Sequence, residues 1–318
     1  MRERTPQELV ASERVFPAEN TNAVDGVIRI SPAKTLWIFG HGLVGIAGIF
    51  IYPQVGAFLV FLLLSAVTIC AGHSVGMHRL LIHRSFATPR WVEYILVWLG
   101  VLVGMAGPFG MIRLHDLRDW HQRQTHCPPH PSHDAVFWRD AWWQLCCYFD
   151  LRNPPEIIIE NNVLKDRFYR FLERTWMVQQ VPLAILLYLF GGWAWVCWGI
   201  SLRIFISLTG HWMVGHYAHK QGEQGWRIDG VAVQGYNLPR LGLITFGENW
   251  HGNHHAFPHS AKLGLEQGQI DPGFWLISVL HFLGLASKVK TPDSEPPRAG
   301  LQPCEGSKQM HQTLWHSN

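Results

Sequence analysis

Two long apolar segments, residues 36–71 and 181–209, constrain the fold of this chain more than any other feature of its sequence. The first contains no acidic or basic residue apart from one histidine and is interrupted by a Tyr-Pro-Gln step at 52–54. The second is interrupted at Gly191 and Gly192. A helix needs roughly 20 apolar residues to cross the hydrocarbon core of a bilayer. The sequence therefore predicts two transmembrane helical hairpins, about four spans in all.

The composition agrees with a membrane protein. Apolar residues make up 48% of the 318 residues and charged residues only 15%, whereas soluble domains average about 25% charged residues. The formal net charge of +3 is too small to indicate nucleic acid as a partner. The six cysteines show no CxxC spacing, which fits reduced thiols that pack as small hydrophobic side chains.

The polar segments define the expected domain organisation. Residues 1–33 read as a cytosolic polar tail, 34–286 as the membrane domain and 287–318 as a disordered C-terminal tail. A third apolar run, 91–112, is either a further hairpin-like insertion or a helix buried against the others. Two hairpins place both termini on one side, and the Lys and Arg residues of the same segments make that side cytoplasmic. We expect an all-α, multi-pass integral membrane protein with a cytosolic helical cap.

Histidines cluster at the ends of the apolar segments. The stretch GENWHGNHHAFPH places His251, His254 and His255 within five residues, and on a helix His251 shares a face with the other two. His78 and His83 are five residues apart, so on an α-helix they point about 140° apart. Both can reach one metal only if the helix bends or ends between them, unless two metals share them. Neutral imidazole is a common ligand of iron, copper and zinc, so a metal site is predicted.

A middle group of histidines is less regular. His115 and Asp119 are four residues apart and share a helical face, and a carboxylate can ligate iron as well as imidazole can. In the Pro-rich loop that follows, we expect His126, His130 and His133 to be surface residues. The later stretch GHWMVGHYAH adds three candidates: His211, His216 and His219.

Together these motifs resemble the membrane-bound fatty acid desaturase family, in particular the acyl-CoA desaturases, over about residues 36–285. HRLLIH at 78–83 matches the HxxxxH box of that family, and GENWHGNHHAFP at 247–258 matches its last HxxHH box. The resemblance implies that His219 supplies an extra ligand and that Trp212 lines a bent acyl tunnel. The expected metal ligands, including the carboxylate chosen by spacing, are His78, His83, His115, Asp119, His219, His251, His254 and His255.

The chain departs from the family pattern at two places. The middle box has Arg118 and Asp119 where two histidines are expected, and Gly215 stands where the family usually has an Asn that holds a water on one metal. Either Asp119, His211 or His216 restores the coordination shell, or the site holds metal differently. We expect Asp119 to replace a histidine; the alternative is that it only forms an ion pair with a nearby arginine.

The chemistry follows from the resemblance. No side-chain acid or base can break an unactivated methylene C–H bond, so two iron ions with O₂ as co-substrate are implied. No catalytic group is expected beyond the metal centre, and Glu248 is the first candidate to orient its imidazoles. The expected substrate is a long-chain acyl thioester, with acyl-CoA and a delta-9-type reaction favoured, and Arg79 and Arg118 are expected to bind its head group. Electrons would come from a ferredoxin, rubredoxin or b-type cytochrome with its reductase.

Two other functions stay open at this stage. A membrane diiron hydroxylase or oxygenase of lipids or alkyl chains would carry the same boxes. A non-enzymatic membrane metal-binding or transport protein could carry a cytosolic His-rich loop. Transporters place ionisable ligands inside the membrane spans, and here only His41 lies there, which argues against transport.

Overall fold

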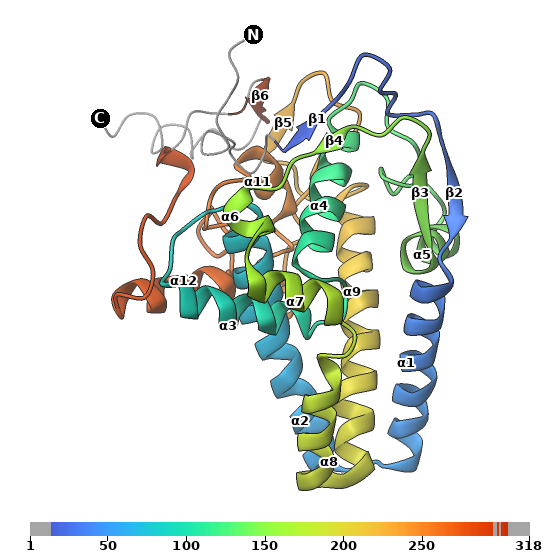
Figure 1. Ribbon diagram of the computed structural model, residues 1–318. Helices are drawn as coiled ribbons and strands as arrows, with labels where there is room; N and C mark the ends of the chain where they lie inside the picture. The colour runs from blue at the N-terminus through green and yellow to red at the C-terminus, as the bar shows by residue number, and fades with distance from the viewer. Residues whose placement is uncertain (1–13, 295–297, 299, 305–318) are drawn as a thin grey trace.

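The computed structural model describes residues 14–294, 298 and 300–304, and these are mostly helical (Figure 1). Long helices extend from one end of the molecule. Shorter elements gather at the other end and form a cap, which includes the helix that carries His251, His254 and His255. The mostly helical architecture agrees with the predicted fold class.

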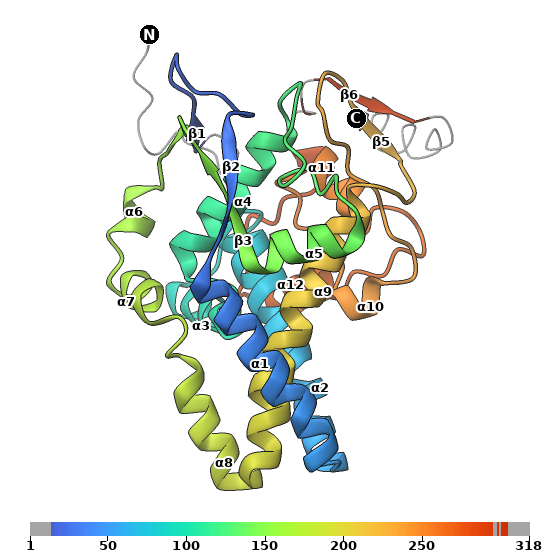
Figure 2. The same ribbon diagram turned by 90° about the vertical axis from the view of Figure 1, so that its right-hand side faces the viewer.

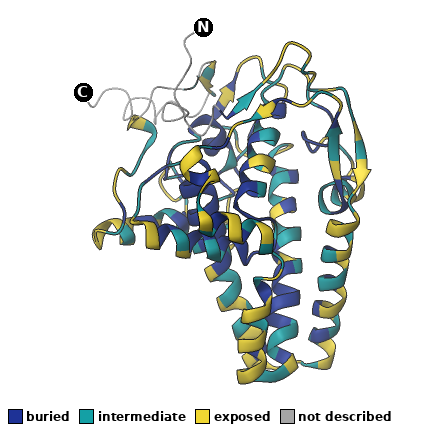
Figure 3. Cartoon of the chain, viewed as in Figure 1, coloured by how far each residue is buried: buried dark blue, intermediate teal, exposed yellow. Residues whose placement is uncertain are grey.

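Three helices among the described residues are long and apolar enough to cross a membrane: Pro32–Ile51, Val55–Ile82 and Gln180–Ala218. Much of their outer surface is exposed (Figure 3). The exposed residues include Phe50 and Phe190, which are 79% and 74% exposed. Exposed apolar surface of this extent is typical of helices that lie in a membrane.

Each of these helices has its own internal construction. The first is α1 (Pro32–Ile51). The second begins as α2 (Val55–Ala66) and continues as the π-helix η2 (Val67–Ile82). The third consists of three consecutive segments: α8 (Gln180–Val196), the π-helix η3 (Cys197–Leu202) and α9 (Arg203–Ala218).

The third helix reverses direction at Gly192. Its φ of 60° and ψ of −156° lie in a region that only glycine adopts readily. Figure 2 shows α8 and α9 as two arms that meet at the far end of the bundle. The glycine pair that interrupts the apolar segment in the sequence is therefore a turn.

The apolar run at 91–112 does not form another long helix. It contains α3 (Arg90–Val101), which packs across η2, and the start of α4 (Pro108–Gln122). Met77 of η2 and Val97 and Val101 of α3 are buried in one hydrophobic cluster. Of the two expectations for this run, the buried helix is the one observed.

The other helices of the described chain are short and belong to the cap or its edge. They are α5 (Phe137–Cys146), α6 (Asn161–Leu164), α7 (Arg167–Thr175), α10 (Gly242–Thr245), α11 (His251–Ala256), α12 (Pro272–Phe282) and the 3₁₀ turn η4 (Pro292–Ser294).

The described residues also form three small antiparallel sheets of two strands each, which the all-α prediction did not include. They pair β1 (Val15–Phe16) with β4 (Glu156–Ile157), β2 (Gly26–Ile30) with β3 (Cys147–Leu151), and β5 (Trp226–Ile228) with β6 (Leu301–Pro303).

All three strand pairs include residues of the expected terminal tails. β1 and β2 fasten the second half of the expected N-terminal tail to the membrane domain through backbone hydrogen bonds, which polar side chains do not prevent. β6 likewise orders residues 301–303 within the expected disordered tail. The predictions for 1–13, 295–297, 299 and 305–318 lie outside the described residues.

Candidate metal centre

His78 and His83 converge because the last turn of η2 is π-helical. The main-chain N–H of His83 donates to the carbonyl of His78 at 3.0 Å, which is the five-residue hydrogen bond of a π-helix. The two ring centroids lie 4.8 Å apart. The bend that an α-helix would have required is therefore replaced by a change of helical pitch.

The first group of imidazoles comes from three segments of the chain. It consists of His78, His83, His115 and His254, and one nitrogen of each lies within 4.8 Å of the others. The Nε2 atoms of His83 and His115 are 3.2 Å apart. Burial lowers the pKa of His83 and His254 well below the usual 6.5, and neighbouring histidines lower it further. These rings are therefore neutral and can act as ligands.

The second group consists of His219, directly after α9, and His251 and His255 on α11. Their Nε2 atoms form a triangle with sides of 3.1, 3.0 and 3.3 Å. Nδ1 of His219 lies 2.7 Å from the carbonyl of Gly215, to which it donates, so its Nε2 lone pair is available.

The triangle of nitrogens fits one metal ion. Nitrogens that each lie about 2.1 Å from a metal, between a right angle and a tetrahedral angle apart, are separated by about 3.0–3.4 Å. Three neutral imidazoles cannot satisfy one another by hydrogen bonds in such a triangle, because each ring has one N–H and one acceptor nitrogen. The triangle is therefore compatible with three lone pairs directed at one cation.

The short helix α11 serves both groups. His251 and His255 are four residues apart on one face, and His254 contributes to the other group. Asn253, 1% exposed, fixes the helix: its main-chain N–H donates to Asn237 at 3.1 Å, and its side-chain oxygen accepts from Asn237 at 3.0 Å.

Glu248 orients His78, as the sequence led us to expect. One oxygen of its carboxylate lies 2.7 Å from Nδ1 of His78, and the other accepts from Ser74 at 2.6 Å. Burial raises the pKa of Glu248, but His78 and Arg79 outweigh burial and hold the pKa well below its ordinary value. The ionised carboxylate keeps the proton of His78 on Nδ1 and leaves Nε2 free.

Asp116 has the same relationship to His115, and we did not identify it from the sequence. Its carboxylate lies 3.1 Å from Nδ1 of His115 and 3.1 Å from the guanidinium of Arg14. Arg14, which is fully buried, also pairs with Glu160 at 2.7 Å. An acidic residue directly beside a candidate ligand was the available signal in the sequence.

Asp119 belongs to neither group. Its carboxylate lies 2.9 Å from Arg123 and 3.6 Å from Arg298. Burial raises the pKa of Asp119, but these two guanidinium groups outweigh burial and lower the pKa to about 2. Arg118 turns away and donates to Gln144 at 2.7 Å. The geometry thus differs from the expected ligand position and matches the ion-pair alternative.

The other two predicted substrate contacts lie inside the protein. Arg79 is 1% exposed and donates to Asp271 at 2.8 Å and to the carbonyl of Ala261 at 2.7 Å. It therefore ties segments of the cap together and does not reach the surface, where we expected a head group. Trp212 is buried and donates its indole N–H to Asp140 at 2.8 Å. Its place in an acyl tunnel stays a prediction.

Neither of the remaining histidine candidates joins the two groups. The ring of His211 packs against His73, with centroids 4.8 Å apart. His216 belongs to a separate cluster, in which Nδ1 of His216 and Nδ1 of His133 lie 2.7 and 3.0 Å from one oxygen of Asp140. Because the Trp212 N–H donates to the same oxygen, these contacts form a hydrogen-bonded cluster rather than a metal site.

The Pro-rich loop after α4 is the clearest error of the sequence analysis. His126 is exposed, as predicted, but His130 and His133 are buried, at 8% and 0% exposure. The loop folds back onto the protein because the carbonyl of His130 accepts from Gln144 at 2.6 Å. Loops of this composition usually run over the surface, so the sequence alone gave the wrong location.

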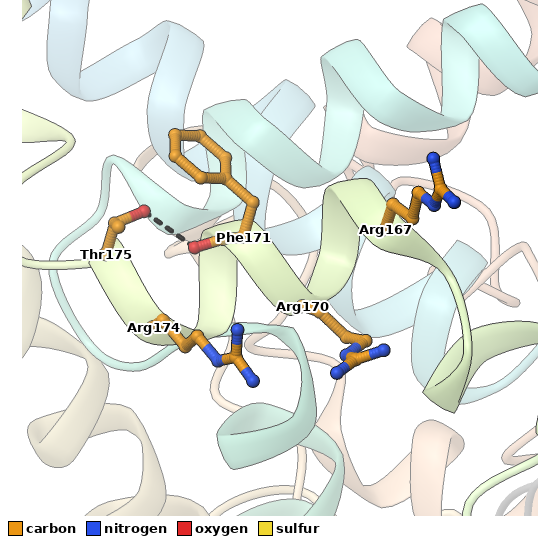
Figure 4. A pocket seen from close by; sticks show the side chains of 5 residues that line it. All are labelled: Arg167, Arg170, Phe171, Arg174 and Thr175. Carbon is orange, nitrogen blue, oxygen red and sulfur yellow. Dashed lines mark hydrogen bonds between the residues drawn. The ribbon is translucent and has the colours of Figure 1, made fainter.

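A shallow pocket lies on α7 (Figure 4). It is lined by Arg167, Arg170, Phe171, Arg174 and Thr175. Arg170 and Arg174 are four residues apart and extend to the same side of the helix. Among the described residues, no carboxylate lies within ion-pairing distance of the three arginines. α7 ends shortly before the span that begins at Gln180, so the pocket combines unpaired positive charge with nearby apolar surface.

Comparison with known proteins identifies the family. The family model described as "Fatty acid desaturase" matches residues 53–265. The "sn-1 stearoyl-lipid 9-desaturase" of Anabaena variabilis is 34% identical over 236 residues, which cover 74% of this chain and 85% of the relative. The "Icosanoyl-CoA 5-desaturase" of Limnanthes douglasii is 31% identical over 277 residues, which cover 83% of this chain and 72% of the relative. The chain therefore belongs to the fatty acid desaturase family and is an oxidoreductase that desaturates fatty acyl chains.

Proposed function

We propose that the chain carries out O₂-dependent desaturation of long acyl chains at the two histidine groups. Each turnover converts –CH₂–CH₂– to –CH=CH–. O₂ takes up the two hydrogens together with two electrons and two protons, and two water molecules form. The observation that supports this proposal is the convergence of seven buried or half-buried imidazoles into two adjacent groups that share α11.

The two groups would each hold one iron ion. When bound, the irons supply the oxidising power from O₂ that cleavage of an unactivated C–H bond requires. The protein supplies neutral imidazoles, because burial lowers the pKa of His251 well below the usual range, as it does for His83 and His254. Glu248 and Asp116 keep the rings in the tautomer that directs Nε2 inward.

We further propose four membrane crossings with a cytoplasmic metal centre. The two arms that meet at Gly192 would each cross once, and α1 and the second helix would each cross once. Figure 1 places α11, β1 and β6 at the same end of the molecule, which supports termini and metal centre on one side. Reporter fusions at residues 14 and 304 that report opposite faces would contradict this topology.

The substrate carries an anionic head group in this proposal, and the pocket on α7 would bind it. Arginine forks bind phosphate bidentately, and the apolar surface beside the pocket suits the start of an acyl chain. Acyl-CoA and a delta-9 position are the first substrate and product to test. The relatives include a lipid-linked 9-desaturase and a CoA-linked 5-desaturase by name. Phospholipid is therefore the second substrate to test.

The electrons come from a separate protein, because the sequence contains no haem, flavin or Cys₄ motif. A ferredoxin, rubredoxin or b-type cytochrome with its reductase would fit.

Membranes that contain the chain should be supplied in turn with each donor system and with stearoyl-CoA or stearoyl phospholipid. The position of any new double bond should then be determined by mass spectrometry. A new double bond supports the proposal, a hydroxylated chain supports the oxygenase alternative, and zinc in place of iron contradicts the proposed iron centre.

A further inference from the structure

We propose that His133 completes the second histidine group by holding a water molecule on its metal ion, an inference that rests on the proposed metal centre. The second group has three imidazoles, whereas the first has four. His133 is not among the nitrogens within 4.8 Å of one another in that group, so its contact with the metal would pass through one water. Waters that bridge two polar groups in this way are common in buried sites.

His133 is buried and has an unused nitrogen. Its side chain is fully inaccessible, and its ring lies parallel to that of His219, with centroids 5.3 Å apart and planes 4° apart. Nδ1 lies 3.0 Å from Asp140, but Nε2 has no hydrogen-bond partner among the described residues. A buried polar atom without a partner is costly, so a missing water or ligand is the simplest explanation.

Asp140 determines what this nitrogen can do. It is fully buried and accepts hydrogen bonds from His133, His216 and Trp212 through one oxygen. The proton of His133 therefore resides on Nδ1, and Nε2 presents a lone pair. A metal-bound water donates hydrogen bonds, so Nε2 of His133 is the complementary acceptor. Asp140 keeps the ring in this tautomer by accepting the Nδ1 proton.

Nε2 of His133 closely approaches α9 at Gly215. A Cβ atom added at Gly215 would lie 3.1 Å from Nε2 of His133. The carbonyl of the same residue accepts the Nδ1 proton of His219. Nε2 of His133 therefore faces the turn of α9 that positions a ligand of the second group, at a point where the chain has no side chain.

The backbone holds His133 in place at some cost. Its φ is +59°, a left-handed value that is uncommon outside glycine. Lys220, which follows His219, donates to the carbonyl of Ala135 and so fastens the loop to the end of α9. Such conformations persist where surrounding contacts impose them, and they cluster at functional sites.

The test uses the full chain in detergent, reconstituted with ⁵⁷Fe(II) and examined by Mössbauer spectroscopy. His133→Ala should change the quadrupole doublet of one iron and weaken its binding by about 10- to 100-fold, while the other doublet stays unchanged. His133→Gln retains an acceptor and should restore the signal in part. His130→Ala is the matched control, because His130 is buried in the same loop but stacks on Phe149, 6.1 Å away, and not on His219.

The outcomes separate this inference from the proposed function. Wild-type protein that binds no iron overturns both. Wild-type protein with two irons and a His133→Ala spectrum identical to it overturns only the role of His133. If His133→Ala does not fold, Gly215→Ala tests the same point, since its methyl group would lie 3.1 Å from Nε2 of His133 and displace that nitrogen while Asp140 and His133 remain. An unchanged doublet in that variant also rejects the inference.

Discussion

The ring planes of the adjacent residues His254 and His255 of α11 are 85° apart, and the two rings contribute to different imidazole groups. α11 is fixed by the hydrogen bonds of Asn253 to Asn237, so one turn of backbone holds the two groups in a fixed relation. A change in this turn therefore affects both groups, whereas a change in one ring should affect one.

Replacing His254 with Ala should remove about one of the two iron ions and abolish desaturation, because the first group loses one of its four nitrogens. Iron content per chain and product formation are the measurements. His126→Ala, in an exposed part of the loop, should retain both irons. Full turnover by the His254 variant would exclude His254 as a ligand.

Glu248→Gln keeps the size of the side chain and its contact with Ser74 but removes the negative charge beside His78. We expect iron affinity at the first group to fall by about 10- to 100-fold. Competition with a chelator measures this change. Glu266→Gln, on an exposed residue, serves as the control, and equal affinities for the two variants would contradict the role of Glu248.

Asp119→Asn should retain both irons, since Asp119 lies in neither group and pairs with Arg123. Loss of the ion pair should destabilise the protein by at most about 1 kcal/mol. Loss of one iron in this variant would instead establish the carboxylate as a ligand, as the spacing first suggested.

The same pair predicts a pH dependence. The folded pKa of Asp119 is lowered to about 2, below the usual value of about 3.9 in unfolded chains. The stabilisation is therefore fully present above pH 4 and is lost as the pH falls toward 2. The difference in thermal stability between wild type and Asp119→Asn should shrink over this range, and a constant difference would contradict the assigned pair.

The double variant Arg170→Ala/Arg174→Ala should raise the KM for a substrate with an anionic head group by about tenfold or more and leave kcat nearly unchanged, because these side chains would act on binding and not on the metal centre. Steady-state kinetics with acyl-CoA and with phospholipid identify the head group concerned. Arg29→Ala, at an exposed ion pair with Asp150, is the control. A fall in kcat at constant KM would place the pocket outside substrate binding.

Local patterns in the sequence were enough to predict the membrane helices and part of the site. Apolar runs give the long helices, and Gly192 marks the turn within α8 because few other residues adopt its conformation. The spacing of His251 and His255 already placed them on one helical face, as observed in the second group.

Other features depend on contacts between distant segments. The convergence of His78 and His83 requires a π-helical turn, and no residue pattern distinguishes that pitch from an α-helix. The burial of His133 depends on two later residues: Asp140 accepts a hydrogen bond from its ring, and Lys220 donates to the carbonyl of Ala135 in the same loop. Arg14 and Asp116 are 102 residues apart, so the sequence around neither residue predicts that they pair.

The positions of the imidazoles along the chain also determine when each group can be completed during synthesis. Both groups draw on α11 as well as on earlier segments, so neither can be complete until His255 has left the ribosome. The membrane helices, whose last residue is Ala218, are synthesised before that point. If the proposed iron centre is correct, iron could bind to complete groups only after α11 has been synthesised, and a chain halted before α11 should bind no iron.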